Sequence, residues 1–372
     1  MIVGIPKEIK AFENRIAILP AGVKSFTAEG HTVYIQNNAG VGSGFSNEEY
    51  IEAGAKILNT PEEIYQTADM IYKVKEPLPP EYPLMREGQI IFAYLHLAPD
   101  TRQTDALLKT GVTAIAYETV QKESGTLPLL APMSEIAGRM SIQVGAYLMQ
   151  KSNQGSGILL GGVPGVAPGH VVIIGGGIVG INAAKMAVGL GARVTIIDLS
   201  IERLSYIHDV LSSRVVTLVS NSCNVEKSVT GGDLIVGAVL VPGARAPKIV
   251  TEDMIKKMRP GSVLVDVSID QGGSIETIDQ LTNHENPYFV KHGIVHYSVP
   301  NMPGAVPRTS TFALSNATMP YALKIANMGA EEAMKSDPAL MKGLNVYKGR
   351  ITNKGVAEAQ NREYEPYKKI KK

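Results

Sequence analysis

The sequence predicts an α/β protein built from doubly wound parallel sheets. Through roughly the first 130 residues, short apolar runs alternate with amphipathic segments, which is the pattern of repeated strand–helix–strand units. Further along, Val171–Ile174 is an apolar, mostly β-branched run that ends in a glycine-rich turn, and Ile181–Leu190 follows with helical spacing. At 372 residues the chain is long for one core and suits about two domains.

The glycine-rich turn indicates a dinucleotide-binding unit. Gly175, Gly177 and Gly180 match G-x-G-x-x-G, in which the glycines permit a tight turn, close approach of the backbone to a pyrophosphate, and close helix packing. The helix that follows offers unpaired N–H groups to the phosphates. A second expected strand, Arg193–Asp198, ends in a carboxylate that can accept hydrogen bonds from a ribose 2′-OH and repels a 2′-phosphate. The unit is therefore expected to be Rossmann-like and to bind NAD rather than NADP.

The whole chain is expected to form two Rossmann-like domains that flank a cleft and are joined by two long helices. Residues 1–128 are the first segment of a substrate (catalytic) domain, and residues 129–306 are the NAD-binding domain. Residues 307–372 are too few for a third domain, so we expect them to return and complete the first, discontinuous domain. The strands expected in the first domain are Ile2–Ile5, Thr32–Gln36, Met70–Lys73, Ile90–Tyr94 and Thr113–Ala116, and the helices are Pro20–Glu29, Ser46–Ala53, Pro61–Gln66 and Asp100–Thr110.

The elements of the second domain begin after a proline-containing stretch. Pro128 to Pro132 break the helical pattern, and Ser134-Glu135 is expected to open a helix that runs to about Lys151. A loop rich in Gly and Ser precedes the dinucleotide unit. The later elements expected are buried strands at Leu234–Leu240 and Ser262–Asp266, a linker at Met302–Pro307 and a long helix at Ser310–Ala330.

Composition and charge exclude several classes of protein. A formal net charge of +1 leaves no basic field for nucleic acid, and the apolar stretches are short and broken by Gly or Pro, so no membrane span is expected. The single cysteine, Cys223, rules out an internal disulfide framework, suits a reducing cytoplasm and is expected to be a packing thiol. The first residues lack the features of a signal peptide. We expect a soluble cytoplasmic protein without a metal site, whose basic tail is a solvated end.

Four polar residues follow expected strands, where ligands of a doubly wound sheet bind. Arg15 comes after the first strand, Lys75 and His96 after two later strands of the first domain, and Asp270 after a strand of the second. A pair of cations suits a carboxylate substrate, and a histidine and an aspartate can carry protons. Together these residues indicate oxidation of a small amino or hydroxy acid.

Each of the four residues also has a purely structural interpretation. Lys75 could form an exposed ion pair with Glu76, and Arg15 could simply neutralise a neighbouring glutamate. His96 lies between two leucines and could be a packing residue, and Asp270 precedes Gln-Gly-Gly and could cap a turn.

At this point the sequence resembles a known family, the alanine dehydrogenase / pyridine nucleotide transhydrogenase family, and in particular its bacterial alanine dehydrogenases. The resemblance is collinear over nearly the whole chain. It is carried by Gly4-Ile-Pro-Lys-Glu with Asn14-Arg15, Lys73-Val-Lys75-Glu-Pro, Tyr94-Leu-His96-Leu-Ala, Ala131-Pro-Met-Ser134-Glu-Ile-Ala-Gly-Arg, the glycine-rich turn, Val267-Ser-Ile-Asp270-Gln-Gly-Gly and Val299-Pro-Asn301-Met-Pro-Gly-Ala-Val-Pro-Arg-Thr. It implies reversible, NAD-dependent oxidative deamination of L-alanine to pyruvate and ammonia by a cytoplasmic homohexamer.

The resemblance also implies roles for individual residues. Arg15 and Lys75 would hold the substrate carboxylate and carbonyl, and His96 and Asp270 would manage protons. Arg203 keeps a positive charge where some members carry a lysine, whereas Asp279 replaces another basic position and is assigned no contact. The positions expected to contact the cofactor are Ser134, Gly175, Gly177, Ile178, Val179, Gly180, Asp198, Arg203, Ser220, Val239, Leu240, Val267, Ser268, Ile269, Ser298, Val299, Pro300 and Asn301.

Three alternative functions stay open from the sequence. The chain could be the NAD-binding subunit of a proton-translocating transhydrogenase, although it has no membrane span and no second nucleotide domain. It could be an NAD-binding regulator without turnover, although such a protein need not keep cation pairs and proton carriers. A saccharopine-type dehydrogenase would need space for a much larger substrate.

Overall fold

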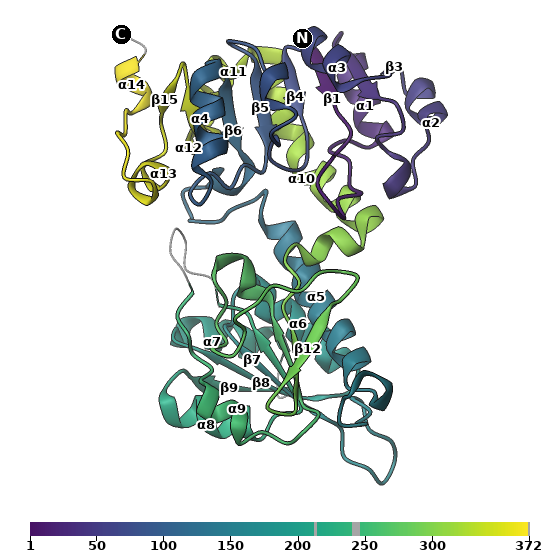
Figure 1. Ribbon diagram of the computed structural model, residues 1–372, viewed down its shortest axis with the longest axis vertical. Helices are drawn as coiled ribbons and strands as arrows, with labels where there is room; N and C mark the ends of the chain where they lie inside the picture. The colour runs from purple at the N-terminus through teal and green to yellow at the C-terminus, as the bar shows by residue number, and fades with distance from the viewer. Residues whose placement is uncertain (212–213, 240–245, 371–372) are drawn as a thin grey trace. The chain divides into compact units, whose positions relative to one another are not determined.

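The computed structural model describes residues 1–211, 214–239 and 246–370, and the chain divides into two compact units (Figure 1). Unit 1 comprises Met1–Met133 together with Val306–Lys372, and unit 2 comprises Ser134–Ala305. Each unit has its own sheet and is described by itself.

Unit 1 is built on an eight-stranded sheet of order β15-β14-β6-β5-β4-β1-β2-β3. From β3 to β6 all neighbouring strands are parallel, whereas β14 and β15 pair antiparallel at one edge. The strands are β1 (Ile2–Ile5), β2 (Thr32–Gln36), β3 (Lys56–Leu58), β4 (Met70–Tyr72), β5 (Ile90–Ala93), β6 (Thr113–Ala116), β14 (Leu344–Tyr347) and β15 (Arg350–Ile351). The helices are α1 (Pro20–Ala28), α2 (Asn47–Glu52), α3 (Pro61–Thr67), α4 (Thr101–Thr110), α10 (Pro307–Met328), α11 (Ala330–Ser336), α12 (Pro338–Lys342), α13 (Lys354–Ala359) and α14 (Tyr367–Ile370).

The central strands of unit 1 are buried on both faces, as the parallel arrangement requires. Every residue of β4, β5 and β6 is buried. Helices α2 and α3 begin at side-chain caps: Ser46 with Glu49, and Thr60 with Glu63, form reciprocal capping boxes. The local sequence therefore sets where these two helices start, and the apolar strand residues set which layer lies inside.

Unit 2 is built on a seven-stranded sheet of order β12-β13-β11-β10-β7-β8-β9, parallel except for the antiparallel edge strand β12. Its strands are β7 (His170–Ile174), β8 (Arg193–Asp198), β9 (Val215–Val219), β10 (Leu234–Gly237), β11 (Val263–Asp266), β12 (Tyr288–Lys291) and β13 (Ile294–Tyr297). Its helices are α5 (Ala131–Leu148), whose first turn lies in unit 1, then α6 (Ile178–Gly189), α7 (Ile201–Leu211), α8 (Ser222–Thr230) and α9 (Glu252–Lys256).

Two parallel-dominated sheets with interleaved helices confirm the predicted fold class, but several predicted boundaries were wrong. Helix α5 begins at Ala131 rather than at Ser134, because Pro132 falls in the first turn of the helix, where a missing N–H costs nothing. The segment expected to be a linker contains a 3₁₀ turn at Met302–Ala305, and α10 starts immediately afterwards at Pro307. The strand expected at Leu234–Leu240 ends at Gly237.

None of the helices in the described part of the chain combines the length and apolar character needed to cross a membrane.

Candidate active site

Three of the predicted site residues follow neighbouring strands of unit 1. Strands β5, β4 and β1 are adjacent and parallel, so their carboxyl ends open on the same edge of the sheet. Arg15, Lys75 and His96 lie in the segments that leave these three ends. The topology therefore brings residues far apart in the sequence to one edge, which is where a doubly wound sheet binds its ligand.

Arg15 is buried and is held by a neighbouring carboxylate. Its Nε donates to Glu13 Oε1 at 2.7 Å and its Nη2 donates to Glu13 Oε2 at 2.6 Å, while Nη1 lies 3.1 Å from Met133 Sδ. Burial opposes ionisation of Glu13, but the hydrogen bonds and charge of Arg15 prevail and lower the pKa of Glu13 to about 2. The pair with Glu13 that we considered for Arg15 does exist, but it is buried, and such a fork orients the guanidinium.

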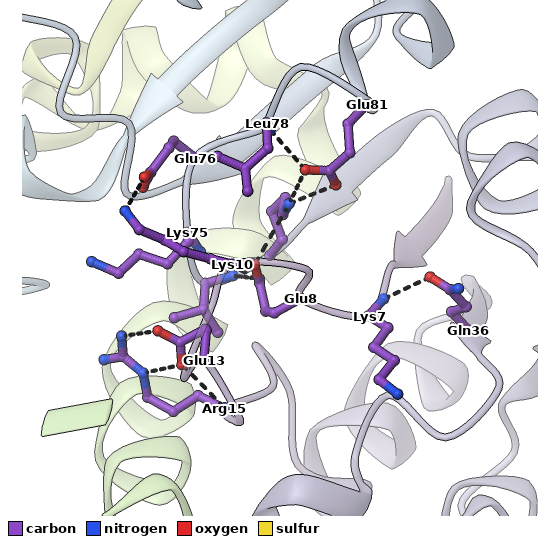
Figure 2. Close-up of polar contacts among 12 residues, drawn as sticks. Lys7, Glu8, Lys10, Glu13, Arg15, Gln36, Lys75, Glu76, Leu78 and Glu81 are labelled. Carbon is purple, nitrogen blue, oxygen red and sulfur yellow. Dashed lines mark hydrogen bonds and ion pairs between the residues drawn. The ribbon is translucent and has the colours of Figure 1, made fainter. Parts of the chain in front are cut away.

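Lys75 is buried too, which excludes the exposed ion pair with Glu76. Glu76 instead pairs with Lys10, and within the described residues the Lys75 ammonium makes no hydrogen bond or ion pair (Figure 2). Burial and the neighbouring Arg15 guanidinium both lower the pKa of Lys75. Arg15 and Lys75 are thus two neighbouring buried cations, and Lys75 has no counter-ion among the described residues. Such a pair forms a site suited to a small anion.

The Tyr94 ring is near both the lysine and the histidine. The Lys75 Nζ is 6.0 Å from the centre of the Tyr94 ring, and the His96 ring stacks on that ring with centroids 5.8 Å apart and planes 10° apart. The Tyr94 hydroxyl donates to the Leu129 carbonyl at 2.5 Å, which keeps the ring in place. The fixed Tyr94 ring therefore packs against both the Lys75 and the His96 side chains.

The backbone of His96 is left-handed, with φ of 48°, an uncommon conformation for a residue other than glycine. Its N–H donates to Glu118 Oε1 at 2.6 Å, which holds this conformation, and the side chain is exposed. The histidine is therefore not the packing residue that its leucine neighbours allowed. Strained, exposed residues at the end of a strand are typical of functional sites.

In unit 2 the glycine-rich turn has the geometry that a dinucleotide needs. Gly175 has φ of 104°, and a Cβ on Gly180 would lie 1.9 Å from the Gly175 carbonyl oxygen, so both positions require glycine. Among the described residues, nothing lies within 4 Å of where a Cβ on Gly177 would be, so this backbone is open to a ligand at the start of α6. These features fit a bound pyrophosphate.

Asp198 and Arg203 both turn toward this glycine turn. Asp198 Oδ2 accepts from the Gly176 N–H at 2.6 Å and Oδ1 accepts from the Ser200 N–H at 2.8 Å, so the carboxylate is fixed at the end of β8. The Arg203 Nε donates to the Gly176 carbonyl, and its guanidinium lies over the Tyr206 ring at 4.8 Å. Arg203 therefore supports the turn as well as lying near the expected ribose position.

Asp270 lies on a loop organised by a buried aspartate that the sequence analysis did not single out as functional. Asp266 ends β11 and accepts from the N–H groups of Ser268 at 3.0 Å, Ser274 at 2.7 Å and Ile275 at 3.1 Å. Asp270 itself is exposed on this loop, and its Oδ2 accepts from the Asn301 N–H at 3.5 Å. The buried Ser268 hydroxyl has no partner among the described residues, as expected of a group left for a ligand.

The remaining predicted cofactor positions belong to unit 2 and differ in accessibility. Ser298 and Val299 are buried, and the Ser298 hydroxyl donates to the Gln280 carbonyl at 3.0 Å. Leu240 lies outside the described residues. Half-buried or exposed positions are Ser134, Ile178, Val179, Ser220, Val239, Val267, Pro300 and Asn301, and Ile269 is 9% exposed.

Sequence reasoning considered Glu13 only as a neutralising partner of Arg15 and missed three other residues that shape the site. Tyr94, Glu118 and Met133 contact the predicted residues directly. Tyr94 could have been found from the sequence, because it lies only two residues before His96. Glu118 and Met133 come from distant segments, and nothing in the sequence connects them with the site.

The fold and the glycine turn define a two-domain, Rossmann-like dinucleotide-binding protein. Comparison with family models narrows this class. The alanine dehydrogenase/PNT N-terminal domain matches residues 4–137, and the alanine dehydrogenase/PNT C-terminal domain matches residues 141–354. The chain belongs to the alanine dehydrogenase/PNT family, and this membership implies a pyridine nucleotide cofactor.

Curated relatives match over nearly their full length. An alanine dehydrogenase of Methanococcus maripaludis is 59% identical over 369 residues, which cover 99% of each chain. An alanine dehydrogenase 2 of Staphylococcus aureus strain USA300 is 57% identical over 364 residues, covering 98% of each chain.

Solved structures agree with these matches. A structure of L-alanine dehydrogenase superposes with a TM-score of 0.94 and 51% identity, covering 97% of this chain and 99% of that one. A transhydrogenase from Sinorhizobium meliloti superposes with a TM-score of 0.82 at 22% identity, covering 94% and 100% of the two chains, and shows a shared fold alone.

Proposed function

We propose that this protein is an NAD-dependent L-alanine dehydrogenase that interconverts L-alanine with pyruvate and ammonium. The observation that carries the proposal is the pair of buried cations, Arg15 and Lys75, at the carboxyl edge of the unit 1 sheet. Relatives at 57–59% identity that carry the name alanine dehydrogenase support it.

Arg15 binds the substrate carboxylate. Its guanidinium is already oriented by Glu13, so little conformational entropy is lost when the substrate binds. Lys75 donates to the substrate carbonyl oxygen in the direction of reductive amination. The lowered pKa of its ammonium makes it a better proton donor to that oxygen.

His96 and Asp270 carry protons. In oxidative deamination the amine must lose its proton before hydride leaves Cα, and a base must then activate the water that attacks the resulting iminium. A histidine can serve as this base near neutral pH. Asp270 stabilises the cationic imine or acts as a second proton carrier.

The dinucleotide is held by the glycine turn and Asp198. The N–H groups at the start of α6 would hold the pyrophosphate, and the Asp198 carboxylate would accept from the ribose hydroxyls, which would favour NAD over NADP. Ser268, just after β11, offers a hydroxyl that has no partner among the residues the structure describes. When bound, the nicotinamide accepts hydride from the substrate or returns it.

The test is a spectrophotometric assay with a panel of amino acids. NADH formation with L-alanine, and NADH oxidation with pyruvate plus ammonium, are the expected results. Formation of NADH with L-lysine derivatives but not with L-alanine would overturn the proposal. A homohexameric assembly and a cytoplasmic location are further proposals, the first of which sedimentation velocity can test.

A further inference from the structure

Glu8 is a buried glutamate that the proposed reaction does not use, and it contacts the backbone of Lys75. The Oε1 of Glu8 accepts from the backbone N–H of Val74 at 2.6 Å and from that of Lys75 at 3.3 Å. Its Oε2 lies 3.6 Å from the Lys73 ammonium, and the residue is 8% exposed. Glu8 therefore positions the segment that carries one of the two proposed substrate cations.

The counter-charge of Glu8 is shared with a second carboxylate. Lys73 donates to the two oxygens of Glu81 at 2.6 and 2.8 Å, much closer than its distance to Glu8. Glu81 also accepts from the Tyr65 hydroxyl at 3.0 Å and from the Leu78 N–H at 2.8 Å. The negative charge of Glu8 is consequently less well neutralised by Lys73 than that of Glu81.

Glu8, Lys73 and Glu81 belong to a group of charged side chains that also includes Arg15 and Lys75, and that we call the charged cluster (most of its members are labelled in Figure 2). Lys10 is its half-exposed member, paired with Glu76, and the others are buried. The cluster has as many carboxylates as cations, so a bound substrate carboxylate adds an unbalanced negative charge. Its members are Glu8, Lys10, Glu13, Arg15, Lys73, Lys75, Glu76 and Glu81.

We propose that Glu8 takes up a proton when a carboxylate substrate binds beside Arg15 and Lys75, so that the buried cluster stays electrically balanced. An uncompensated charge in a buried site is costly, and protonation of the least compensated acid removes that cost. Protonated Glu8 keeps its Oε1 available to the Val74 and Lys75 N–H groups, so Lys75 stays in position. The inference rests on the proposed function, because it needs the substrate at these two cations.

The other carboxylates are poorer candidates for this proton. Burial opposes ionisation of Glu13 and Glu76, yet contacts with cations lower the pKa of each, Glu13 to about 2. For Glu8, burial prevails over the attraction of Lys73 and raises its pKa to about 7. The charged and titratable groups that act on Glu8, or on which it acts, are Lys73, Glu81, Glu13, Arg15, Tyr65 and Tyr117.

The sign of the expected pH dependence follows from linkage. The complex favours protonated Glu8, whereas free protein loses this proton as the pH rises above about 7. Substrate carboxylates should therefore bind more weakly as the pH rises through this range, with a limiting slope of about tenfold per pH unit for one proton.

The experiment measures proton uptake when pyruvate binds to the full-length protein saturated with NADH, with ammonium left out to prevent turnover. Isothermal titration calorimetry at pH 8, in two buffers of different ionisation enthalpy, counts the protons taken up. Glu8→Gln is the informative variant, because an amide oxygen can replace Oε1 toward Val74 and Lys75 while the titration is lost. Glu87→Gln, at an exposed glutamate, is the matched control.

On binding pyruvate, wild type and Glu87→Gln should each take up about one proton more than Glu8→Gln does. The affinity for pyruvate should fall with rising pH in wild type, and the part of this fall that is due to Glu8 should be absent in Glu8→Gln. His96→Ala separates any uptake by the imidazole from that by Glu8. Negligible uptake by wild type at pH 8, or equal uptake by wild type and Glu8→Gln, overturns the inference while leaving alanine dehydrogenase activity intact. Failure of wild type to bind pyruvate or to turn over L-alanine would instead overturn the proposed function.

Discussion

Both oxygens of Glu13 hold the guanidinium of Arg15, with Nε–Oε1 at 2.7 Å and Nη2–Oε2 at 2.6 Å. This fork fixes the plane of the guanidinium before a substrate arrives. A lysine at this position would keep the charge but could not form the fork, because its ammonium is a point charge. The pair therefore makes geometry, and not charge alone, the testable property of Arg15.

For Arg15 we expect Arg15→Ala to lower kcat/KM for L-alanine by roughly a hundredfold or more, since a buried charge-assisted contact is worth about 2–5 kcal/mol. Arg15→Lys should recover only part of the loss. Steady-state kinetics of both variants, with NADH affinity as the control, provide the measurement. Full activity in Arg15→Lys would show that the fork to Glu13 is irrelevant to catalysis.

For Lys75 we expect Lys75→Ala to lose roughly a hundredfold or more in kcat/KM, with NADH affinity little changed. Lys56→Ala is a matched control, because the Lys56 ammonium also lies over a tyrosine ring, 5.9 Å from the centre of Tyr34, but on an exposed residue. Equal values of kcat/KM for the two variants would show that Lys75 has only a structural role.

For the proton carriers we expect His96→Ala and Asp270→Asn to fold and bind NADH yet to lose about 10²–10⁴ in turnover. The wild-type deamination rate should rise with pH, because a neutral amine and an unprotonated base are both needed. The pH profile of kcat/KM for L-alanine is the decisive measurement. A wild-type rate and profile in His96→Ala would mean that another residue carries the proton.

For the cofactor we expect a strong preference of the wild type for NAD, relaxed in Asp198→Ser. The carboxylate that repels a 2′-phosphate is then gone, and with it the acceptor of the Gly176 N–H. The ratio of kcat/KM for NAD and NADP measures this change, and Asp209→Ser in α7 is an exposed control. Equal use of NADP by the wild type would contradict the role given to Asp198.

For stability against pH we expect His296 to make the protein acid-sensitive. Burial lowers the pKa of His296 to about 4 from 6.5, and its ring nitrogens contact Thr277 Oγ1 and the Ile294 carbonyl, both at 2.8 Å. The unfolded chain binds a proton below pH 6.5 that the folded chain excludes, so the free energy of unfolding falls as the pH drops from 6.5 toward 4. His296→Gln should flatten this fall in thermal melts, whereas the exposed His208→Gln should not.

Local sequence pattern accounts for the fold class and for the presence of the glycine turn. Strand residues such as Val171–Ile174 are recognisable by their apolar, β-branched character, and Gly175 and Gly180 by their G-x-G-x-x-G spacing directly after that strand. These features depend on neighbours within a few positions along the chain. The predicted start of α5 was nevertheless wrong, because a proline in the first turn of a helix cannot be told from a helix-breaking proline by sequence alone.

Burial and pairing of the charges were decided by tertiary structure. Glu8 contacts Val74, and Lys10 contacts Glu76, only because β1 and β4 lie side by side and parallel, so that the loops at their ends meet. No periodicity in the sequence encodes which carboxylate a cation will find. The same residue types would have been consistent with solvated surface pairs, and it is the desolvation imposed by the packed sheet that makes Lys75 and Glu8 chemically distinctive.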